Sequence, residues 1–379
     1  MLWEMKFGGT CMSKIYELYG YRLNQWNEQA EHNLSKAWCP FMNAECDGGG
    51  NRFQSAIDLK KNPALSMRIP DKETVQVGVC SLQTHEGEQP WIVCPRRLLS
   101  LKGGKFSDYQ SYVRNQLSNF SELEKSKKYF AWSEVKIKTE STNSDDESKW
   151  FDYTFDYVLS GVQRKRLDDV AEIVGLPVSV VKRTATKNGY ALASRDSEIW
   201  IDDFPSDPLI IIEVMTSSTS GGNKKNRSQI AMACEDAILK GKDHTGPGIN
   251  YRQVWARMVS QLIVKSQVGM AWGGKTIWLV QDVLADYISK STGLILSQYL
   301  SEHLDEVNIL SFGYGAKINT DDNVIIDLDK ADLFSGPITN SGNSFSREGF
   351  IDIVKIGAPP PKEQIWKSLL NKAPVGVWK

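Results

Sequence analysis

The segment PLIIIEVM at residues 208–215 is a continuous apolar run bounded by polar segments. Runs of this kind are typical of a central strand that is buried on both faces of a sheet. Glu213 stands at the end of the run, and a buried carboxylate is costly unless it binds a cation or a hydrogen-bond donor. The segment therefore predicts a buried strand with one charged residue that needs a partner.

A second carboxylate, Asp156, lies in the alternating segment WFDYTFDYVLSG at 150–161. In the nuclease motif D…(D/E)xK, an Asp and a Glu on neighbouring strands hold Mg²⁺ against a scissile phosphate and its attacking water. The third position of this motif is Met215 here, which neither orients water nor stabilises charge. The alternative is that Asp156 and Glu213 are ordinary strand residues with hydrogen-bonded neighbours.

Strand and helix patterns alternate along the rest of the chain. Strands are predicted at 75–82, 91–95, 130–139, 150–161, 189–194, 198–202 and 275–281. Helices are predicted at 14–35, 106–130, 166–184, 227–240, 250–267 and from Asp282 onward. Together these patterns predict an α/β fold.

The helix pattern at 251–265 offers a replacement for the missing lysine of the motif. Its apolar stripe consists of Val254, Met258 and Leu262, and Gln261 and Lys265 are i,i+4 neighbours beside that stripe. Both polar side chains would then point toward the strand ends. The alternative is a solvated helix edge.

The composition is that of an ordinary globular protein. The chain has 379 residues, and 45 basic against 46 acidic residues leave a formal charge of −1. This balance argues against a histone-like protein but not against a local basic groove. No apolar run approaches a membrane span, and the N-terminus has charges where a signal peptide needs an apolar stretch. We expect a cytoplasmic protein with no membrane partner.

Four of the six cysteines form an N-terminal constellation, Cys39-x6-Cys46-x33-Cys80-x13-Cys94. In a reducing compartment, spaced cysteines are metal ligands more often than disulfides. Four thiolates from two loops suit a tetrahedral structural metal, either zinc or a single iron. The spacing differs from that of paired CxxC motifs, so four unrelated buried thiols are the alternative. Cys234, on an apolar helix face, reads as a small core residue.

Five short stretches then occur in a recognisable order: WCPFM (38–42), GVCSL (78–82), IVCPRRLL (92–99), TFDYVL (154–159) and IIEVMT (211–216). In this order they resemble the NotI-like type II restriction endonucleases. The resemblance covers roughly residues 38–290 and is specific at the cysteine motifs. It implies a PD-(D/E)xK nuclease core, with a mixed sheet flanked by helices, and an N-terminal Cys₄ site for iron or zinc. It also implies a homodimer that cuts palindromic double-stranded DNA with Mg²⁺.

The resemblance also assigns residues. Asp156 and Glu213 match the Mg²⁺-binding carboxylates, and Glu134 matches an additional active-site glutamate. The four matches to the structural metal ligands are Cys39, Cys46, Cys80 and Cys94. Because Met215 stands where the family's usual lysine would be, another polar group, such as Gln261 or Lys265, would be needed for catalysis.

The chain between the two carboxylates is longer than in that family, and the extra segment reads LDDVAEIVGLPVSVVKRTATKNGY (167–190). A small residue, a turn glycine and an apolar anchor stand at helix-turn-helix spacing, at Ala171, Gly175 and Val181. The following hairpin would be a wing, and Ser179, Lys182 and Arg183 would face DNA. The alternative is an amphipathic helical hairpin that packs on the core.

Two further basic pairs are candidates for DNA contacts. Arg96 and Arg97 directly follow Cys94-Pro95, and a metal knuckle would hold them rigid. Lys224 and Lys225 follow the flexible STSGG turn and would meet a phosphate near the active site. The alternative for this second pair is a solvated helix start.

One motif points to another class of protein. Gly269-x4-Gly274-Lys275-Thr276 fits the phosphate-loop pattern of nucleotide hydrolases, with VIID at 324–327 as its magnesium-binding partner. That loop should follow a strand and open a helix, whereas here the preceding segment looks helical and TIWLVQ looks like a strand. A phosphate-loop hydrolase therefore remains an alternative of lower rank.

These interpretations divide the chain into three parts. Residues 1–104 would hold the Cys₄ site, 105–300 the nuclease core with a helix-turn-helix-like insert at about 163–206, and 301–379 a segment of unknown role. The expected function is Mg²⁺-dependent cleavage of double-stranded DNA by a type II restriction endonuclease. A DNA-binding protein with an impaired nuclease site is the competing function, as Met215 permits.

Overall fold

The structure is a computed structural model that describes residues 13–51, 55–101, 106–139, 151–292, 295–315, 325–338 and 361–377. Two predicted segments begin outside these ranges by one residue, the strand at 150–161 and the VIID segment at 324–327.

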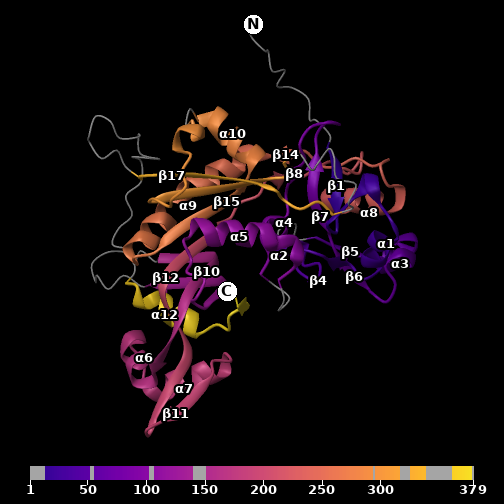
Figure 1. The fold of residues 1–379 in the computed structure, drawn as a ribbon. Coiled ribbons are helices and arrows are strands. Elements are labelled where there is room, and N and C mark those ends of the chain that lie inside the picture. The colour runs from indigo at the N-terminus through magenta and orange to yellow at the C-terminus, as the bar shows by residue number, and fades with distance from the viewer. Residues whose placement is uncertain are drawn as a thin grey trace, which may run out of the picture.

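A mixed sheet forms the centre of the molecule (Figure 1). Its strand order is β17-β16-β15-β12-β10-β9-β18, and the short strand β11 pairs with β12. The direction changes at β12, which runs antiparallel to β10 and parallel to β15. The bounds are β9 (Tyr129–Thr139), β10 (Phe151–Arg166), β11 (Leu192–Arg195), β12 (Glu198–Val214), β15 (Lys275–Gln281), β16 (Val307–Gly313), β17 (Lys330–Gly336) and β18 (Gly376–Val377).

Helices cover both faces of this sheet, which explains the continuous apolar run in β12. Ile212 packs in one cluster with Leu117 of α5, whereas Ile211 packs in another with Val268 of α9. Because successive side chains point to opposite faces, a strand covered on both sides is apolar throughout. The expected α/β fold with a mixed sheet flanked by helices is confirmed. The flanking helices are α5 (Ser111–Phe120), α9 (Tyr251–Ala271) and α10 (Asp282–Thr292).

The N-terminal region builds a second, four-stranded sheet in the order β2-β1-β7-β8, and two small hairpins lie beside it. Cys234 of α8 is fully buried in the core of this region, as its apolar helix face predicts. The strands are β1 (Lys14–Leu18), β2 (Tyr21–Arg22), β3 (Trp38–Cys39), β4 (Ala44–Glu45), β5 (Ala56–Asp58), β6 (Thr74–Gln76), β7 (Val79–Gln83) and β8 (Trp91–Ile92). The helices are α1 (Glu28–Ser35), α2 (Gly48–Asn51), α3 (Pro63–Arg68), α4 (Pro95–Leu98) and α8 (Ile230–Lys240). The short pair β13 (Ser218–Thr219) and β14 (Ile249–Asn250) lies on either side of α8 in sequence.

The far ends of β10 and β12 carry a small projecting module, at the bottom of Figure 1. It consists of α6 (Leu167–Val174), α7 (Val178–Lys187) and the hairpin of β11 with the start of β12. Gly175 ends α6 in the left-handed conformation at φ 63°, which favours glycine and allows the sharp turn into α7. We call these elements, residues 167–201, the insert module.

The C-terminal segment completes both the sheet and the insert module. β16 and β17 extend the central sheet beyond residue 300, where the third part of the chain is predicted to begin. Helix α12 (Glu363–Leu370) packs Ile365 and Leu369 against the same cluster as Val170 and Val181 of the insert module. The described parts of the C-terminal segment, whose role was unknown from the sequence, therefore contribute to the central sheet and to the core of the insert module.

Two predicted helices are wrong in extent. Residues 14–18 form strand β1 because they pair with β7, so only 28–35 of the predicted helix at 14–35 is α-helical. The helix predicted at 106–130 is α-helical only over 111–120. In the first case pairing with a distant chain segment overrides the local pattern. In the second, residues 108–110 form a 3₁₀ turn and strand β9 already begins at Tyr129.

None of the helices in the described ranges is long and apolar enough to span a lipid bilayer.

Candidate active site

Three carboxylates lie in register across adjacent strands of the central sheet. Tyr157 of β10 pairs with Ile212 of β12, so the preceding residue of β10, Asp156, lies opposite Glu213. On the other side, β10 pairs with β9 in a register that places Asp156 opposite Glu134. We call Glu134, Asp156 and Glu213 the carboxylate row. Like charges act pairwise along this row, since, in addition to burial, Asp156 raises the pKa of Glu213 and Glu134 raises the pKa of Asp156. The three carboxylates are not by themselves arranged as a three-residue metal site in the described structure.

Glu134 occupies this row with a strained backbone. Its φ is 51°, in the left-handed region that non-glycine residues rarely adopt. Its backbone carbonyl accepts a hydrogen bond of 2.6 Å from Lys372 Nζ, which follows α12. Strained residues cluster at functional sites because surrounding contacts hold them in place.

Lys265 of α9 meets the row from one face of the sheet. Its Nζ lies 2.6 Å from Glu213 Oε2 and donates a second hydrogen bond, of 2.9 Å, to the carbonyl of Thr154. The lysine is 4% exposed, so it is not part of a solvated helix edge. The structure thus brings the buried ammonium group of Lys265, from helix α9, to the carboxylate of Glu213 on strand β12.

Gln261 lies one turn earlier in α9 and is half-buried. Among the described residues it forms no hydrogen bond with Asp156 or Glu213. Met215, which follows the strand, packs beside the apolar cluster that includes Met258 and Trp278. Of the two helix residues predicted to replace the motif lysine, the structure therefore brings Lys265 to the carboxylates.

Burial dominates the electrostatics of the row. Burial, with Asp156 nearby, raises the pKa of Glu213 from its ordinary 4.5 to about 8, and Lys265 opposes this rise. Burial also raises the pKa of Asp156, while the backbone N–H of Val214, 2.8 Å from Asp156 Oδ2, favours the ionised form. The carboxylates therefore bind protons tightly until another cation replaces them.

One oxygen of the row has no hydrogen-bond partner. Glu213 Oε1 is buried and accepts no hydrogen bond from any described residue. Leaving a buried acceptor unsatisfied costs about 1–3 kcal/mol, and more for a charged group. An oxygen of this kind beside Asp156 fits a divalent cation, for which carboxylate oxygens are preferred ligands.

Arg96 joins the row to the cysteine region. Its guanidinium lies 3.0 Å from Asp47 Oδ2, 3.0 Å from Tyr157 Oη and 3.9 Å from Glu134 Oε1. Arg96 packs against Asp47 and Tyr157 and is only 7% exposed. The predicted DNA contact by Arg96 is therefore replaced by contacts within the site. Sequence reasoning missed Asp47 and Tyr157, although Asp47 follows Cys46 and Tyr157 follows Asp156 directly.

The structure also argues against the predicted DNA contact by Arg97. Arg97 is fully buried, forms an ion pair of 3.1 Å with Glu17 Oε1, and stacks over the rings of Phe41 and Tyr314. Tyr314 Oη also donates to Glu17. A guanidinium enclosed in this way is not available to a DNA phosphate, so Arg97 is a structural residue of the N-terminal core.

The four predicted metal cysteines line one small buried cavity, which we call the cysteine cavity. The Cys39 sulfur accepts hydrogen bonds from two backbone N–H groups that follow it, those of Phe41 and Met42. Cys46 accepts from Gly48 and Cys94 from Arg96 in the same manner. Such turns stabilise sulfur in its charged form, which is the form that binds metals.

The cavity nevertheless has the features of protonated thiols. Burial raises the pKa of Cys39 to about 12, while a hydrogen bond from the Cys80 thiol lowers the pKa of Cys94. Within the described ranges, no group of three or more His, Cys, Asp or Glu side chains is arranged so that it could hold a metal ion. The donor set and its N–H···S turns suit zinc or iron.

The remaining predicted DNA-binding residues lie on the surface, away from the carboxylate row. Ser179, Lys182 and Arg183 are exposed on α7 of the insert module. Lys224 and Lys225 are exposed in the segment before α8. No contact with Asp156 or Glu213 is present for these five side chains in the described structure.

The phosphate-loop pattern has the wrong structural context. Gly269 lies in the last turns of α9 and Lys275 begins β15, so the segment leads from a helix into a strand. A phosphate loop leads from a strand into a helix, whose N-terminus binds the phosphates. Thr276 Oγ1, which would bind Mg²⁺, instead donates to the carbonyl of Lys265. The fold therefore argues against a nucleotide site here.

Comparison with known proteins assigns no relative: no protein-family model matches the chain, and no curated protein sequence is significantly similar to it.

Proposed function

We propose that the chain is a Mg²⁺-dependent type II restriction endonuclease with a PD-(D/E)xK core. The observation that carries the proposal is the carboxylate row with Lys265 on Glu213, at 2.6 Å. The order of elements supports it, because α5, the strands β9, β10 and β12, helix α9 and strand β15 follow one another around the row. The resemblance at the cysteine and carboxylate motifs points to the same class.

Asp156 and Glu213 would hold the Mg²⁺ ion. When bound, this ion polarises the scissile phosphate and lowers the pKa of the attacking water. Glu213 Oε1, which has no hydrogen-bond partner among the described residues, would turn to the ion while Oε2 keeps its contact with Lys265. Loss of the Glu213 proton to solvent accompanies this binding, because a carboxylate must be ionised to ligate.

Lys265 performs the task of the lysine that is missing at Met215. Its ammonium group, held by Glu213 and the Thr154 carbonyl, stabilises negative charge and orients water beside the carboxylates. Glu134 is the exposed member of the row, so it is placed to accept a proton from the attacking water. Arg96 is a positioning residue, because it contacts Glu134 and Tyr157 from the interior.

Two copies of the chain would act on one duplex. A palindromic site has two-fold symmetry, and a dimer with the same symmetry places one carboxylate row on each strand. The cysteine cavity would hold zinc or iron and stabilise the loop that carries Asp47 and Arg96.

Cleavage of a random-sequence DNA library tests the function. With Mg²⁺ or Mn²⁺ we expect discrete products whose ends share one sequence, and with EDTA we expect none. Binding of a specific duplex without cleavage under any metal would instead support the DNA-binding protein with an impaired site. Sedimentation of the protein bound to its duplex would give two chains per site if the homodimer is correct.

A further inference from the structure

Helix α7 presents a face with positive charge and no carboxylate. Its sequence, VSVVKRTATK, contains Lys182, Arg183 and Lys187 but no Asp or Glu. Val181 and Ala185 bury the opposite face of the helix. Lys182 and Arg183 are exposed, and neither forms an ion pair with any described residue. Such a face is suited to an anionic partner.

The insert module holds this helix rigidly. The Tyr190 hydroxyl donates to the Leu369 carbonyl at 2.9 Å, and Asn188 Nδ2 donates to the Leu370 carbonyl at 3.1 Å. Both carbonyls belong to α12, which packs on α6 and α7 as a third helix. A hairpin, β11 with the start of β12, follows α7 directly. Three helices and a hairpin that leave one basic helix face open form the arrangement with which winged helices enter the major groove.

Strand β10 separates the insert module from the carboxylate row. It runs from Asp156 to Arg166, where α6 begins, with register shifts against β12 at Ser160–Gly161 and at Gln163–Lys165. Ten strand residues at about 3.3 Å each give on the order of 30 Å between the row and the start of the insert module. One base pair of B-DNA rises about 3.4 Å, so this distance corresponds to about one helical turn.

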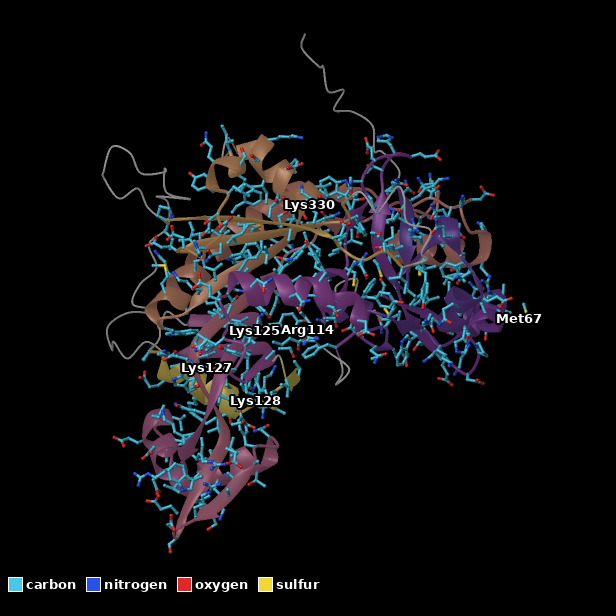
Figure 2. All side chains as sticks on the ribbon, in the orientation of Figure 1. Met67, Arg114, Lys125, Lys127, Lys128 and Lys330 are labelled. Carbon is cyan, nitrogen blue, oxygen red and sulfur yellow. The ribbon has the colours of Figure 1, made fainter. Side chains whose placement is uncertain are left out.

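Three lysines lie between the carboxylate row and the insert module. Figure 2 shows Lys125, Lys127 and Lys128 at the junction between the main body and the insert module. Lys128 Nζ lies 2.8 Å from Asp203 Oδ2 on β12, and the adjacent Tyr129 pairs with Gly161 of β10. Gly161 is midway between Asp156 and Arg166. Lys127 and Lys128 form ion pairs with Glu124 and Asp203, so Lys125 is the member of this trio that has no carboxylate partner among the described residues. A duplex that runs from the row to α7 would pass these side chains on the way.

We infer that the insert module is a DNA-reading element that binds duplex DNA through α7 about one helical turn away from the phosphate at the carboxylate row. Ser179, Lys182 and Arg183 would contact base edges or phosphates there. This inference rests on the proposed function, because the distance is counted from the bond that the row would cut. Recognition would then extend to base pairs well outside the cleaved step.

A charge-matched pair of variants of the full chain tests the inference. The double variant Lys182→Ala/Arg183→Ala removes two charges from α7, and Lys60→Ala/Lys61→Ala removes two exposed charges from the N-terminal region. Affinity for a pool of random-sequence duplexes several turns long is measured over a range of salt concentrations, in EDTA to prevent cleavage. We expect the α7 variant to bind at least about tenfold more weakly, with a salt slope smaller by about 2 than that of the wild type. The control should bind like the wild type.

A second measurement gives the distance. Hydroxyl-radical protection of a cleavable duplex should reach about one turn beyond the cut on each side for the wild type, and the outer protection should disappear in the α7 variant. Equal affinity and equal protection for the two double variants would overturn the inference even if the wild type cuts DNA. If the wild type binds through α7 but does not cut with Mg²⁺ or Mn²⁺, the nuclease proposal fails while the α7 contact stands.

Discussion

The carboxylate row and the cysteine cavity are both buried, but they satisfy their polar atoms in different ways. In the cavity, Cys39, Cys46 and Cys94 take hydrogen bonds from backbone groups that follow them within a few residues. In the row, Glu213 is paired by Lys265, which is 52 residues away, and one of its oxygens keeps no hydrogen-bond partner in the described structure. The sulfur atoms of the cavity thus find backbone partners within their own turns, although the cavity itself joins segments from Cys39 to Cys94. The row instead takes its polar partners from a separate helix and from neighbouring strands.

The largest effect on cleavage should come from Glu213→Gln, which alters the carboxylate row and leaves the cysteine cavity unchanged. The amide cannot supply the negative charge that Mg²⁺ requires, so cleavage should fall at least about 10³-fold. DNA binding in EDTA and the metal content of the cavity should remain unchanged. The matched control is Glu86→Gln, an exposed glutamate in a loop, which should cut like the wild type. Cleavage by Glu213→Gln within tenfold of wild type would remove Glu213 from the mechanism.

Cys80→Ser tests whether the cysteine cavity holds a structural metal. Elemental analysis of the purified wild type should show about one zinc or iron per chain, and Cys80→Ser should show close to none and melt at a lower temperature. Cys234→Ala is the control, because it removes a buried thiol of the same region that does not line the cavity. It should lower the melting temperature but keep the metal. Wild-type protein without any metal would contradict the Cys₄ proposal and leave the row untouched.

Lys265→Met should lower cleavage by about 10²-fold, the effect of losing one well-placed cationic donor. Lys265 lowers the pKa of Glu213, so its removal should raise that pKa further and move the acidic limb of the rate–pH profile upward. Lys265→Arg keeps the charge and should restore part of the rate. An unchanged profile in Lys265→Met would show that the contact at 2.6 Å does not act on Glu213 during catalysis.

A further prediction concerns how stability depends on pH. Glu213 has a pKa of about 8 in the folded chain against an ordinary 4.5, so the folded state binds its proton more tightly than the unfolded state. Stability from this group is therefore fully present below about pH 4.5 and is lost as the pH rises toward 8. In EDTA, the difference in unfolding free energy between wild type and Glu213→Gln should decline over this range. A difference that grows with pH would contradict the raised pKa.

The same contrast explains what could be predicted from the sequence. The apolar run before Glu213 predicted a strand buried on both faces, and TIWLVQ predicted β15, because periodicity and composition act locally. The four cysteines could be grouped from their spacing and from the family resemblance, and they do line one cavity.

Contacts from distant segments could not be predicted in this way. Arg97 has the appearance of a surface arginine after a turn, but Glu17, 80 residues earlier, pairs with it in the core. Residues 14–18 look helical, yet pairing with β7 makes them a strand. For Lys265, helix periodicity gave the face, whereas its contact with Glu213 depends on how α9 packs against β12. Periodicity alone does not fix that packing.

Asp156 and Glu213 are proposed to hold a divalent cation together against a phosphodiester. A crystal structure of the full chain with its duplex and Ca²⁺, which occupies such sites without supporting rapid cleavage, measures this directly. We expect an ion within about 2.3–2.6 Å of one oxygen from each carboxylate, with a DNA phosphate as a further ligand. A bound duplex whose phosphates lie away from the carboxylate row, with no ion between Asp156 and Glu213, would contradict this proposal.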